Sequence, residues 1–273
     1  MTVNSVANFE QKQADFSPTK RFFVQMLTRD IELADAILDL LDNSLDGVAR
    51  SQKKDPEKID YSNYKVEIKF SKSSFEISDN CGGIPTSSID YAFRMGKPEG
   101  VEEEKLATVG VYGIGMKRSI FKMGMNCVIA THHEGDLPFR VEIDRSWINN
   151  DSEWRIPIQT ETGIGDTYGT SVCITELHKN ISKSFSNKQF ETDLINKIVF
   201  SYSYILEKGF SVILNGQKIN PNPVSLRFER SPEGKTAIEP YIYTANIDGV
   251  EIDLIVGFHA PLASESDEED EKY

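Results

Sequence analysis

The chain has 273 residues, of which 39% are hydrophobic, 27% charged and 10% aromatic. It can therefore bury the core of a large domain, and it does not have the composition of a disordered protein. The formal net charge of −13 disfavours a free-standing nucleic-acid surface, because binding to phosphates requires basic side chains. The three cysteines, Cys81, Cys127 and Cys173, form no CxxC or Cys/His cluster, which disfavours a metal–thiolate site.

The two ends of the chain are polar. Residues 1–20 read as an arm, and their start lacks the features of a signal peptide. No apolar run reaches the roughly 18 residues that span a bilayer, and an odd number of cysteines fits a reducing compartment, so we expect a cytoplasmic protein without a membrane partner. Residues 265–272 read ESDEEDEK, which indicates a solvated acidic tail or, alternatively, a loop within a larger protein.

The first half of the chain predicts a helix, a strand pair and two glycine-rich corners. Apolar residues recur at steps of three and four over residues 31–49, as in an amphipathic helix. Alternating residues predict strands at 65–70 and 75–78, followed by a glycine-rich corner at 79–85. Residues 89–95 suit a short helix, and residues 96–110 are polar and suit a mobile loop. A second glycine-rich corner at 110–115 leads into a helix that ends near residue 124.

The second half predicts more strands, one long helix and hairpins. Strands are expected at 126–131, 138–143, 154–158 and 170–177, a helix at 187–207, and hairpins that turn at 215–216 and 248–249. Helices mixed with antiparallel hairpins indicate an α+β fold rather than a doubly wound parallel sheet.

The segment from Gly110 to Ser119 nearly matches a phosphate-binding loop. Gly110 and Gly115 have the P-loop spacing, but Met116 stands where that motif needs lysine. Arg118 occupies the last glycine position of the dinucleotide fingerprint, so that motif fails as well. A glycine-rich turn that opens a helix remains, and its backbone amides can bind phosphate. The alternative is a tight loop that packs a helix onto a sheet.

Three further segments carry polar chemistry. Asp39 and Asn43 share one face of the helix at 31–49, and such oxygen ligands suit Mg²⁺ together with phosphate; the alternative is a polar outer face. Asp79 ends a strand before glycines and could accept a hydrogen bond from an exocyclic amine, or belong to an ordinary Asx–Gly turn. Gly169-Thr170 opens a strand and carries little information alone.

These segments occur in the order found in one superfamily. DLLDNSLDG, DNCGGIP, VYGIGMKRS and GTSVCITEL resemble the four motifs of the GHKL ATPases, the Bergerat-fold superfamily of DNA gyrase B, MutL, MORC proteins and the large heat-shock chaperones. The resemblance spans roughly residues 31–177 and is closest to the MORC branch at GVYGIGMKRSIFKMG. It implies a two-layer sandwich with helices on one face of a mixed, mostly antiparallel sheet.

The resemblance also implies roles for individual residues. Asn43 matches the Mg²⁺ ligand, Asp79 the residue that binds the adenine amine, and Thr170 the residue that holds adenine through water. Residues 96–110 match the ATP lid. The remaining positions expected to contact the nucleotide are Asp46, Gly83, Ile84, Gly110, Gly113, Ile114, Gly115, Met116 and Lys117.

The chain departs from the family pattern at three places. The usual catalytic Glu is Asp39, which is shorter by about 1.5 Å, and a displacement of that size can lower a rate roughly 100-fold. Cys81 replaces a glycine of the second motif. The lysine that senses the γ-phosphate has no assignable equivalent, with Lys218, Lys235 and Lys272 as the candidates.

Taken together, the sequence predicts an ATP-binding and ATP-hydrolysing enzyme with ATP and Mg²⁺ as ligands. The expected domains are an arm at 1–20, the ATPase domain at 21–185 and a connecting helix with a partial transducer-like region at 186–273. The resemblance implies lid closure and a nucleotide-dependent homodimer, with a protein partner or DNA held in the dimer clamp. The alternatives are a nucleotide-gated scaffold with very slow hydrolysis and a histidine-kinase-like phosphotransferase, for which a phosphoacceptor histidine before the domain is missing.

Overall fold

The computed structural model describes residues 14, 16–52, 58–95, 113–160, 167–222, 226–227, 229–230 and 236–258. The chain divides into two compact units, Met1–Asn220 and Pro221–Tyr273. Gly110 and the expected lid at 96–110 lie outside the described residues.

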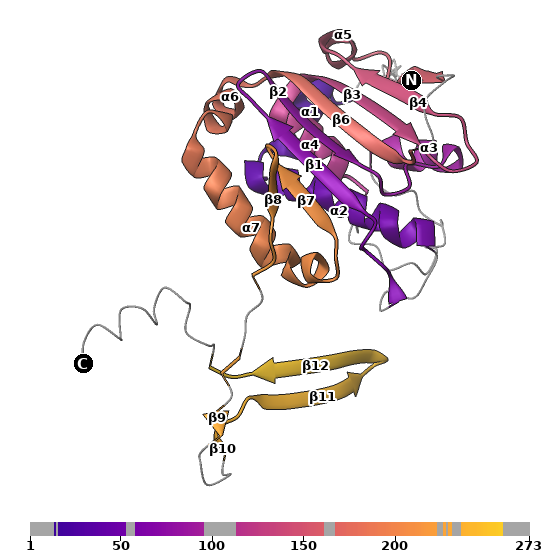
Figure 1. Ribbon diagram of the computed structural model, residues 1–273. Coiled ribbons are helices and arrows are strands. Elements are labelled where there is room, and N and C mark those ends of the chain that lie inside the picture. Colours follow the sequence, from indigo (N-terminus) through magenta and orange to yellow (C-terminus); the bar gives the residue numbers. More distant parts are fainter. Residues whose placement is uncertain are drawn as a thin grey trace, which may run out of the picture. The chain divides into compact units, whose positions relative to one another are not determined.

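An eight-stranded sheet forms the centre of the first unit, with strand order β5-β4-β3-β6-β2-β1-β7-β8 (Figure 1). Every neighbouring pair is antiparallel except β1 and β7, which run parallel. The strands are β1 (Lys65–Phe70), β2 (Ser74–Asp79), β3 (Gly124–His132), β4 (Phe139–Ile143), β5 (Ile158–Thr160), β6 (Gly169–Leu177), β7 (Ser211–Leu214) and β8 (Gln217–Ile219).

Helices form the second layer, and α1, α2 and α4 lie behind the sheet in Figure 1. The helices are α1 (Lys20–Thr28), α2 (Leu33–Gln52), α3 (Ile89–Phe93), α4 (Gly115–Met123), α5 (Arg145–Asn149), α6 (Lys179–Phe185) and α7 (Lys188–Glu207), with a 3₁₀ turn η2 (Thr86–Ser88). The predicted α+β sandwich with a mixed, mostly antiparallel sheet is confirmed.

The core lies between α2 and the sheet. Ile37 and Leu41 of α2 are fully buried, as are the inward-facing Ile68, Ile129 and Ile174 of three strands. Period-four apolar residues on the helix and period-two residues on the strands create these faces. The polar face of α2 is thereby directed toward α4 and the end of β2, where the candidate site lies.

Several local predictions need correction or addition. Residues 154–157 are not a strand, because Trp154 packs edge-on against the rings of Phe23 and Trp147, and the strand beside β4 is formed by Ile158–Thr160. The expected arm ends in α1, whose first residue Lys20 is buried. The short helices α5 and α6 were not predicted.

The hairpins were predicted correctly from their turns. Asn215 and Gly216 connect β7 to β8 with positive φ at both positions, as an Asn–Gly turn requires. In the second unit, Asp248 and Gly249 likewise connect β11 (Tyr241–Ile247) to β12 (Val250–Val256). This unit also contains the pair β9 (Glu229–Arg230) and β10 (Thr236–Ile238).

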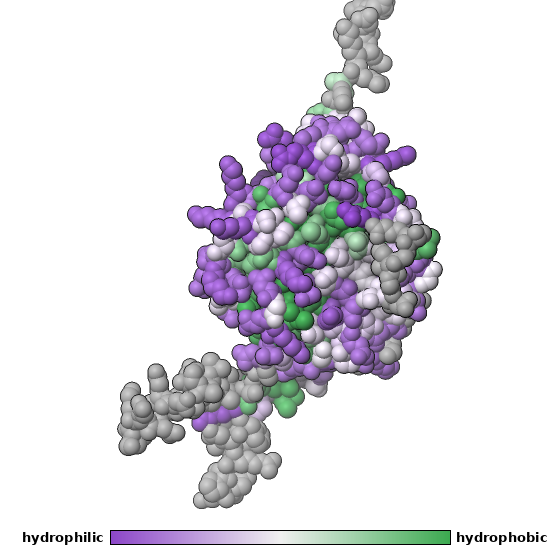
Figure 2. Space-filling view, turned by 45° about the horizontal axis from the view of Figure 1, so that its top comes forward, coloured by the Kyte–Doolittle hydropathy of each residue, from purple (hydrophilic) through white to green (hydrophobic). Residues whose placement is uncertain are grey.

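The face in Figure 2 is mostly hydrophilic and is crossed by a band of hydrophobic residues. Among the described helices, none has both the length and the apolar character that crossing a bilayer requires.

Candidate functional site

The polar residues of α2 occupy different environments. Asn43 is exposed, and its amide nitrogen donates to the carbonyl oxygen of Asp39 at 2.8 Å. This bond directs the Asn43 amide and leaves its side-chain oxygen as an acceptor for a ligand. Asp46 is buried at 6% exposure and is attracted to Arg50, so it lies deeper in the molecule than Asn43.

Asp39 is held by a residue that the sequence did not single out. The Nη2 and Nε atoms of Arg118 donate to Oδ2 of Asp39 at 2.7 and 3.2 Å. Oδ1 of Asp39 accepts no hydrogen bond from any described residue. A methyl group added at Gly115 would lie 3.5 Å from Cγ of Asp39, so the carboxylate lies beside the first turn of α4.

The N-terminus of α4 is open to an anion. Ile114 occupies the N-cap position without a side-chain cap, and the first turn carries no acidic residue. The first backbone hydrogen bond of this helix runs from Arg118 to Ile114, so the three preceding amides point out of the helix end. Such amides, aided by the helix dipole, bind phosphate. Gly113 and Ile114 lie immediately before this end.

Asp79 lies at the end of β2 and is held by three donors. Its Oδ1 accepts from the backbone amides of Cys81 at 2.8 Å and Thr170 at 3.1 Å, and its Oδ2 accepts from the hydroxyl of Ser44 at 2.8 Å. Burial raises the pKa of the Asp79 carboxyl, and these hydrogen bonds oppose the rise. Oδ2 keeps a free lone pair, because Ser44 is its only partner among the described residues.

Two glycines allow the backbone to close around Asp79. Gly83 has φ +69°, and a Cβ at this position would lie 2.0 Å from the carbonyl oxygen of His132. A Cβ at Gly169 would lie 1.9 Å from the carbonyl oxygen of Asp79. No other residue type fits either position without moving a strand.

Thr131 joins the corner to the adjoining strand. Its hydroxyl accepts from the amide of Ile84 at 2.8 Å and lies 3.0 Å from the hydroxyl of Thr170. Thr131 is 4% exposed, so its hydroxyl is shielded from water, whereas Ile84 and Thr170 are half-buried. The structure therefore brings Asp79, Gly83, Ile84 and Thr170 together.

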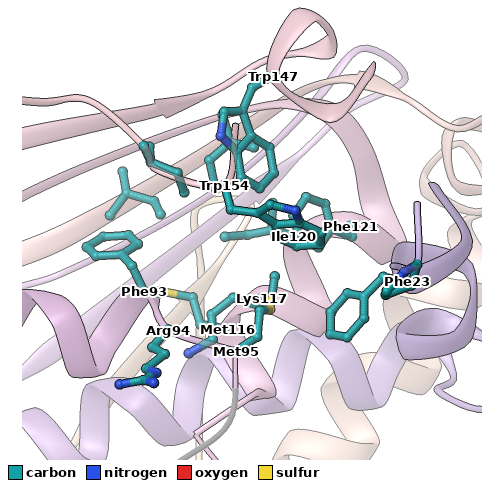
Figure 3. A pocket seen from close by; sticks show the side chains of 14 residues that line it. Phe23, Phe93, Arg94, Met95, Met116, Lys117, Ile120, Phe121, Trp147 and Trp154 are labelled. Atoms are coloured by element: carbon teal, nitrogen blue, oxygen red, sulfur yellow. The ribbon is translucent and has the colours of Figure 1, made fainter. Parts of the chain in front are cut away.

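Lys117 and Met116 point to a different place. The Lys117 ammonium donates to the carbonyl oxygen of Ala92 at 2.7 Å, and burial lowers its pKa to about 8. Both side chains line a cavity with Phe93 and two tryptophans (Figure 3). The Lys117 side chain thus turns toward α3 and away from Asp39.

Sequence reasoning missed Arg118, Ser44 and Thr131. Arg118 lies one turn after Ile114, on the face of α4 that meets α2. Its sequence signal is a positive charge within the glycine-rich motif VYGIGMKRS. Ser44 follows Asn43 directly. Thr131 gives no sequence signal, because its role depends on the pairing that sets it opposite Thr170.

The residues fit a nucleotide-bound magnesium ion better than a protein-bound metal. Within the described ranges, no three His, Cys, Asp or Glu side chains are placed to hold a metal ion. An ion near Asn43 would therefore take most of its oxygen ligands from a triphosphate and water, which is how Mg²⁺ commonly binds.

Sheet order, helical layer and glycine corners define an α+β ATP-binding domain of the Bergerat type. A comparison with protein families matches residues 31–180 to the histidine kinase-, DNA gyrase B-, and HSP90-like ATPases. The match covers more than half of the chain, which therefore belongs to this family of ATPases and shares its binding and hydrolysis of ATP. No curated protein matches the chain.

Proposed function

We propose that the chain binds Mg-ATP across the polar face of α2 and hydrolyses it to drive a conformational cycle. The observation that carries this proposal is the meeting of Asp39, which lies one helical turn before Asn43, with the open N-terminus of α4, while Asp79 lies in a hydrogen-bonded corner at the end of β2. The end at Asp39 and α4 suits a triphosphate, and the end at Asp79 suits the adenine base.

Adenine binds at the Asp79 corner in this proposal. Oδ2 of Asp79 accepts from the exocyclic amine, while Oδ1 stays bonded to the backbone. Gly83 and Ile84 provide backbone beside the base, and Thr170 lies close enough to hold it through water. Because the carboxylate must be ionised to accept the amine, the raised pKa of Asp79 predicts weaker ATP binding in acid.

The triphosphate lies at the other end. Asn43 contributes its side-chain oxygen to the magnesium ion, which neutralises phosphate charge when bound. Backbone amides of Gly115, Met116 and Lys117 face the phosphates at the start of α4, with Gly113 and Ile114 forming the turn before them. The preference of helix N-termini for anions supports this placement. Gly110 belongs to the same proposed turn. Asp46 lies deeper on α2 than Asn43, and its proposed role is to stabilise that helix.

Asp39 is proposed as the general base. Its Oδ1 takes a proton from water as the water oxygen bonds to the γ-phosphorus, the bond to the β–γ bridging oxygen breaks, and ADP leaves. Arg118 orients the carboxylate through Oδ2 and leaves Oδ1 for the water. A general base must reach its water at about 2.6–3.2 Å. Because the aspartate side chain is short, hydrolysis depends on Oδ1 coming within this distance of the water.

The proposed cycle uses nucleotide to close residues 96–110 as a lid and to drive self-association. The expected lid lies in the sequence between α3 and α4, and the N-terminus of α4 belongs to the proposed site. A protein partner or DNA would be enclosed by the dimer, because the acidic charge of −13 disfavours a strong grip on DNA by one copy. Three free thiols fit a reducing cytoplasm.

A second candidate is a nucleotide-gated scaffold with very slow hydrolysis. Asp39 is one carbon shorter than the family's glutamate, and its Oδ2 is already engaged by Arg118. Both features lower the fraction of time in which the carboxylate can act on water. This candidate keeps the binding site and the dimer but removes rapid turnover.

Phosphate release separates the two candidates. Asp39→Ala should lower the rate of an ATPase by about 10²- to 10⁴-fold while ATP affinity changes little. Asp39→Glu should raise the rate strongly if the natural protein is tuned for slow turnover. An Asp39→Ala variant as fast as the wild type would remove Asp39 as the base. Light scattering with a non-hydrolysable ATP analogue tests the dimer separately, and a monomer at all concentrations would exclude it.

A further inference from the structure

The cavity lined by Met116 and Lys117 lies on the side of α4 that faces away from α2 (Figure 3). It has a volume of about 340 Å³ and is lined mainly by aromatic and aliphatic side chains from α1, α3, α4 and the sheet. In Figure 3, Trp147 and Trp154 lie on one side and Met95, Met116 and Lys117 on the other. Cavities of this size and character accept small molecules.

The charge inside this cavity is unbalanced. Among the described residues, its ionisable lining residues are Lys117 and Arg94, and no acidic residue lines it. Arg94 is exposed and points away from the tryptophans (Figure 3). Lys117 is 5% exposed, and its bond to the Ala92 carbonyl is its only hydrogen bond among the described residues. An ammonium group has three donors, so two of them lack an acceptor among the residues that the structure describes.

The described elements around Lys117 supply no counter-charge. Burial lowers the pKa of Lys117, and no carboxylate of the described residues contributes to the shift. On the side of α3, the charged residues are Asp90, which lies on the helix, and Arg94, which follows it directly. From α1, the ammonium of Lys20 lies 3.7 Å from the Trp147 ring centroid, and Asp151 and Glu153 are attracted to Lys20. A buried charge without a partner is costly.

We propose that this cavity binds a small carboxylate with an apolar, preferably aromatic, body, whose carboxylate pairs with Lys117 and whose body packs against the two tryptophans. The ligand supplies the missing negative charge and fills the apolar volume. None of Asn43, Asp79 or Thr170 lines the cavity. Met116 and Lys117 line it with their side chains, whereas the nucleotide proposal uses only their backbone amides. A neutral ligand of the same shape would gain the packing and lose the ion pair.

The chain provides its own fluorescent reporter. It contains two tryptophans, and both line the cavity. Titrating the nucleotide-free chain with 4-phenylbutyrate should change tryptophan fluorescence with a saturable Kd of about 0.1–1 mM, as expected for a ligand of this size. The neutral 4-phenylbutyramide should bind at least about tenfold more weakly, because a charge-assisted hydrogen bond is lost.

Two variants locate the charge. Lys117→Met removes the ammonium and keeps an apolar chain of similar length, so it should bind acid and amide equally. Lys122→Met is the matched control, because Lys122 lies on the same helix and its ammonium also donates to a backbone carbonyl, that of Thr28 at 3.3 Å. This control should retain the preference for the acid.

The pH profile of the unaltered chain gives an independent readout. Lys117 loses its proton as the pH rises through about 8, so affinity for 4-phenylbutyrate should fall roughly tenfold between pH 7 and pH 9, while that for the amide stays constant. No saturable fluorescence change, equal binding of acid and amide at pH 7, or an unchanged preference in Lys117→Met would each overturn the proposal.

Discussion

The corner around Asp79 and the region where α2 meets α4 differ in how completely their polar groups are satisfied. At the corner, Asp79 accepts three hydrogen bonds, and the buried Thr131 joins two segments through its hydroxyl. Where α2 meets α4, Asn43 is exposed, the helix end is uncapped, and one ion pair of Asp39 and Arg118 crosses the gap.

This difference indicates a division of labour. Groups that are already satisfied cannot rearrange without losing hydrogen bonds, so the Asp79 corner is rigid and suits recognition of a fixed shape. Unsatisfied amides and an exposed amide oxygen gain partners only when a ligand arrives. We therefore expect substitutions at the corner to change stability and base recognition, and substitutions between α2 and α4 to change magnesium and phosphate chemistry.

The largest effect on stability is expected for Gly83→Ala. The new methyl group would lie 2.0 Å from the carbonyl oxygen of His132 at a φ of +69°. Gly135→Ala is the matched control, because φ is +84° there and no atom lies within 4 Å of the new Cβ. Chemical denaturation should show Gly83→Ala less stable than this control by at least about 3 kcal/mol. Similar free energies of unfolding for the two variants would show that the backbone around Gly83 can move to accommodate the methyl group.

Lys117 should make stability depend on pH. Its folded pKa of about 8 lies below the ordinary 10.5, so between these values the folded chain has lost a proton that the unfolded chain retains. Lys117 should therefore contribute a rise of up to about 3 kcal/mol in the free energy of unfolding from pH 8 to pH 10.5. The buried thiols of Cys81 and Cys127, whose pKa burial raises, act in the opposite direction above about pH 9, so the measurement is the difference between two variants that both keep them. Denaturation at several pH values should show Lys122→Met gaining stability relative to Lys117→Met over this range; parallel pH profiles would assign the effect elsewhere.

A smaller loss is expected for Thr131→Val. This change keeps the shape of the side chain and leaves the amide of Ile84 without its acceptor. The cost should be about 1–3 kcal/mol of unfolding free energy. Thr160→Val, at an exposed strand position, should change thermal unfolding little, and an equal loss there would indicate a general effect of the substitution.

The smallest stability effect is expected for Arg118→Met. The ion pair with Asp39 is partly exposed, with side-chain exposures of 33% and 22%, and such pairs contribute at most about 1 kcal/mol. The rate of phosphate release should nevertheless change, because the carboxylate loses its orientation. Arg145→Met, which breaks the exposed pair with Glu176, serves as the control. Unchanged turnover in Arg118→Met would remove its positioning role.

The sequence predicted elements whose cause is local. Helix α2 follows from apolar spacing, and the hairpins at Asn215–Gly216 and Asp248–Gly249 follow from turn chemistry. Trp154 was wrongly placed in a strand because its partners, Phe23 and Trp147, come from distant segments. Long-range packing overrode local propensity there.

The candidate site shows the same limit. The ordered motifs identified Asn43 and Asp79, because the spacing between these residues and the neighbouring glycines can be read directly from the sequence. The ion pair of Arg118 with Asp39 joins residues 79 positions apart, and only the packing of two helices brings them together. The direction of the Lys117 side chain could not be predicted from the sequence either, because a long side chain in the first turn of a helix can point to either side.

Calorimetric titration with ATP, with and without Mg²⁺, tests the division of labour most directly. Asn43→Ala should lose the magnesium-dependent part of the affinity and bind ATP without magnesium as the wild type does. Asp79→Asn keeps an acceptor for the amides of Cys81 and Thr170, and should weaken binding by about 10- to 100-fold under both conditions. Wild-type affinity in both variants would contradict the account.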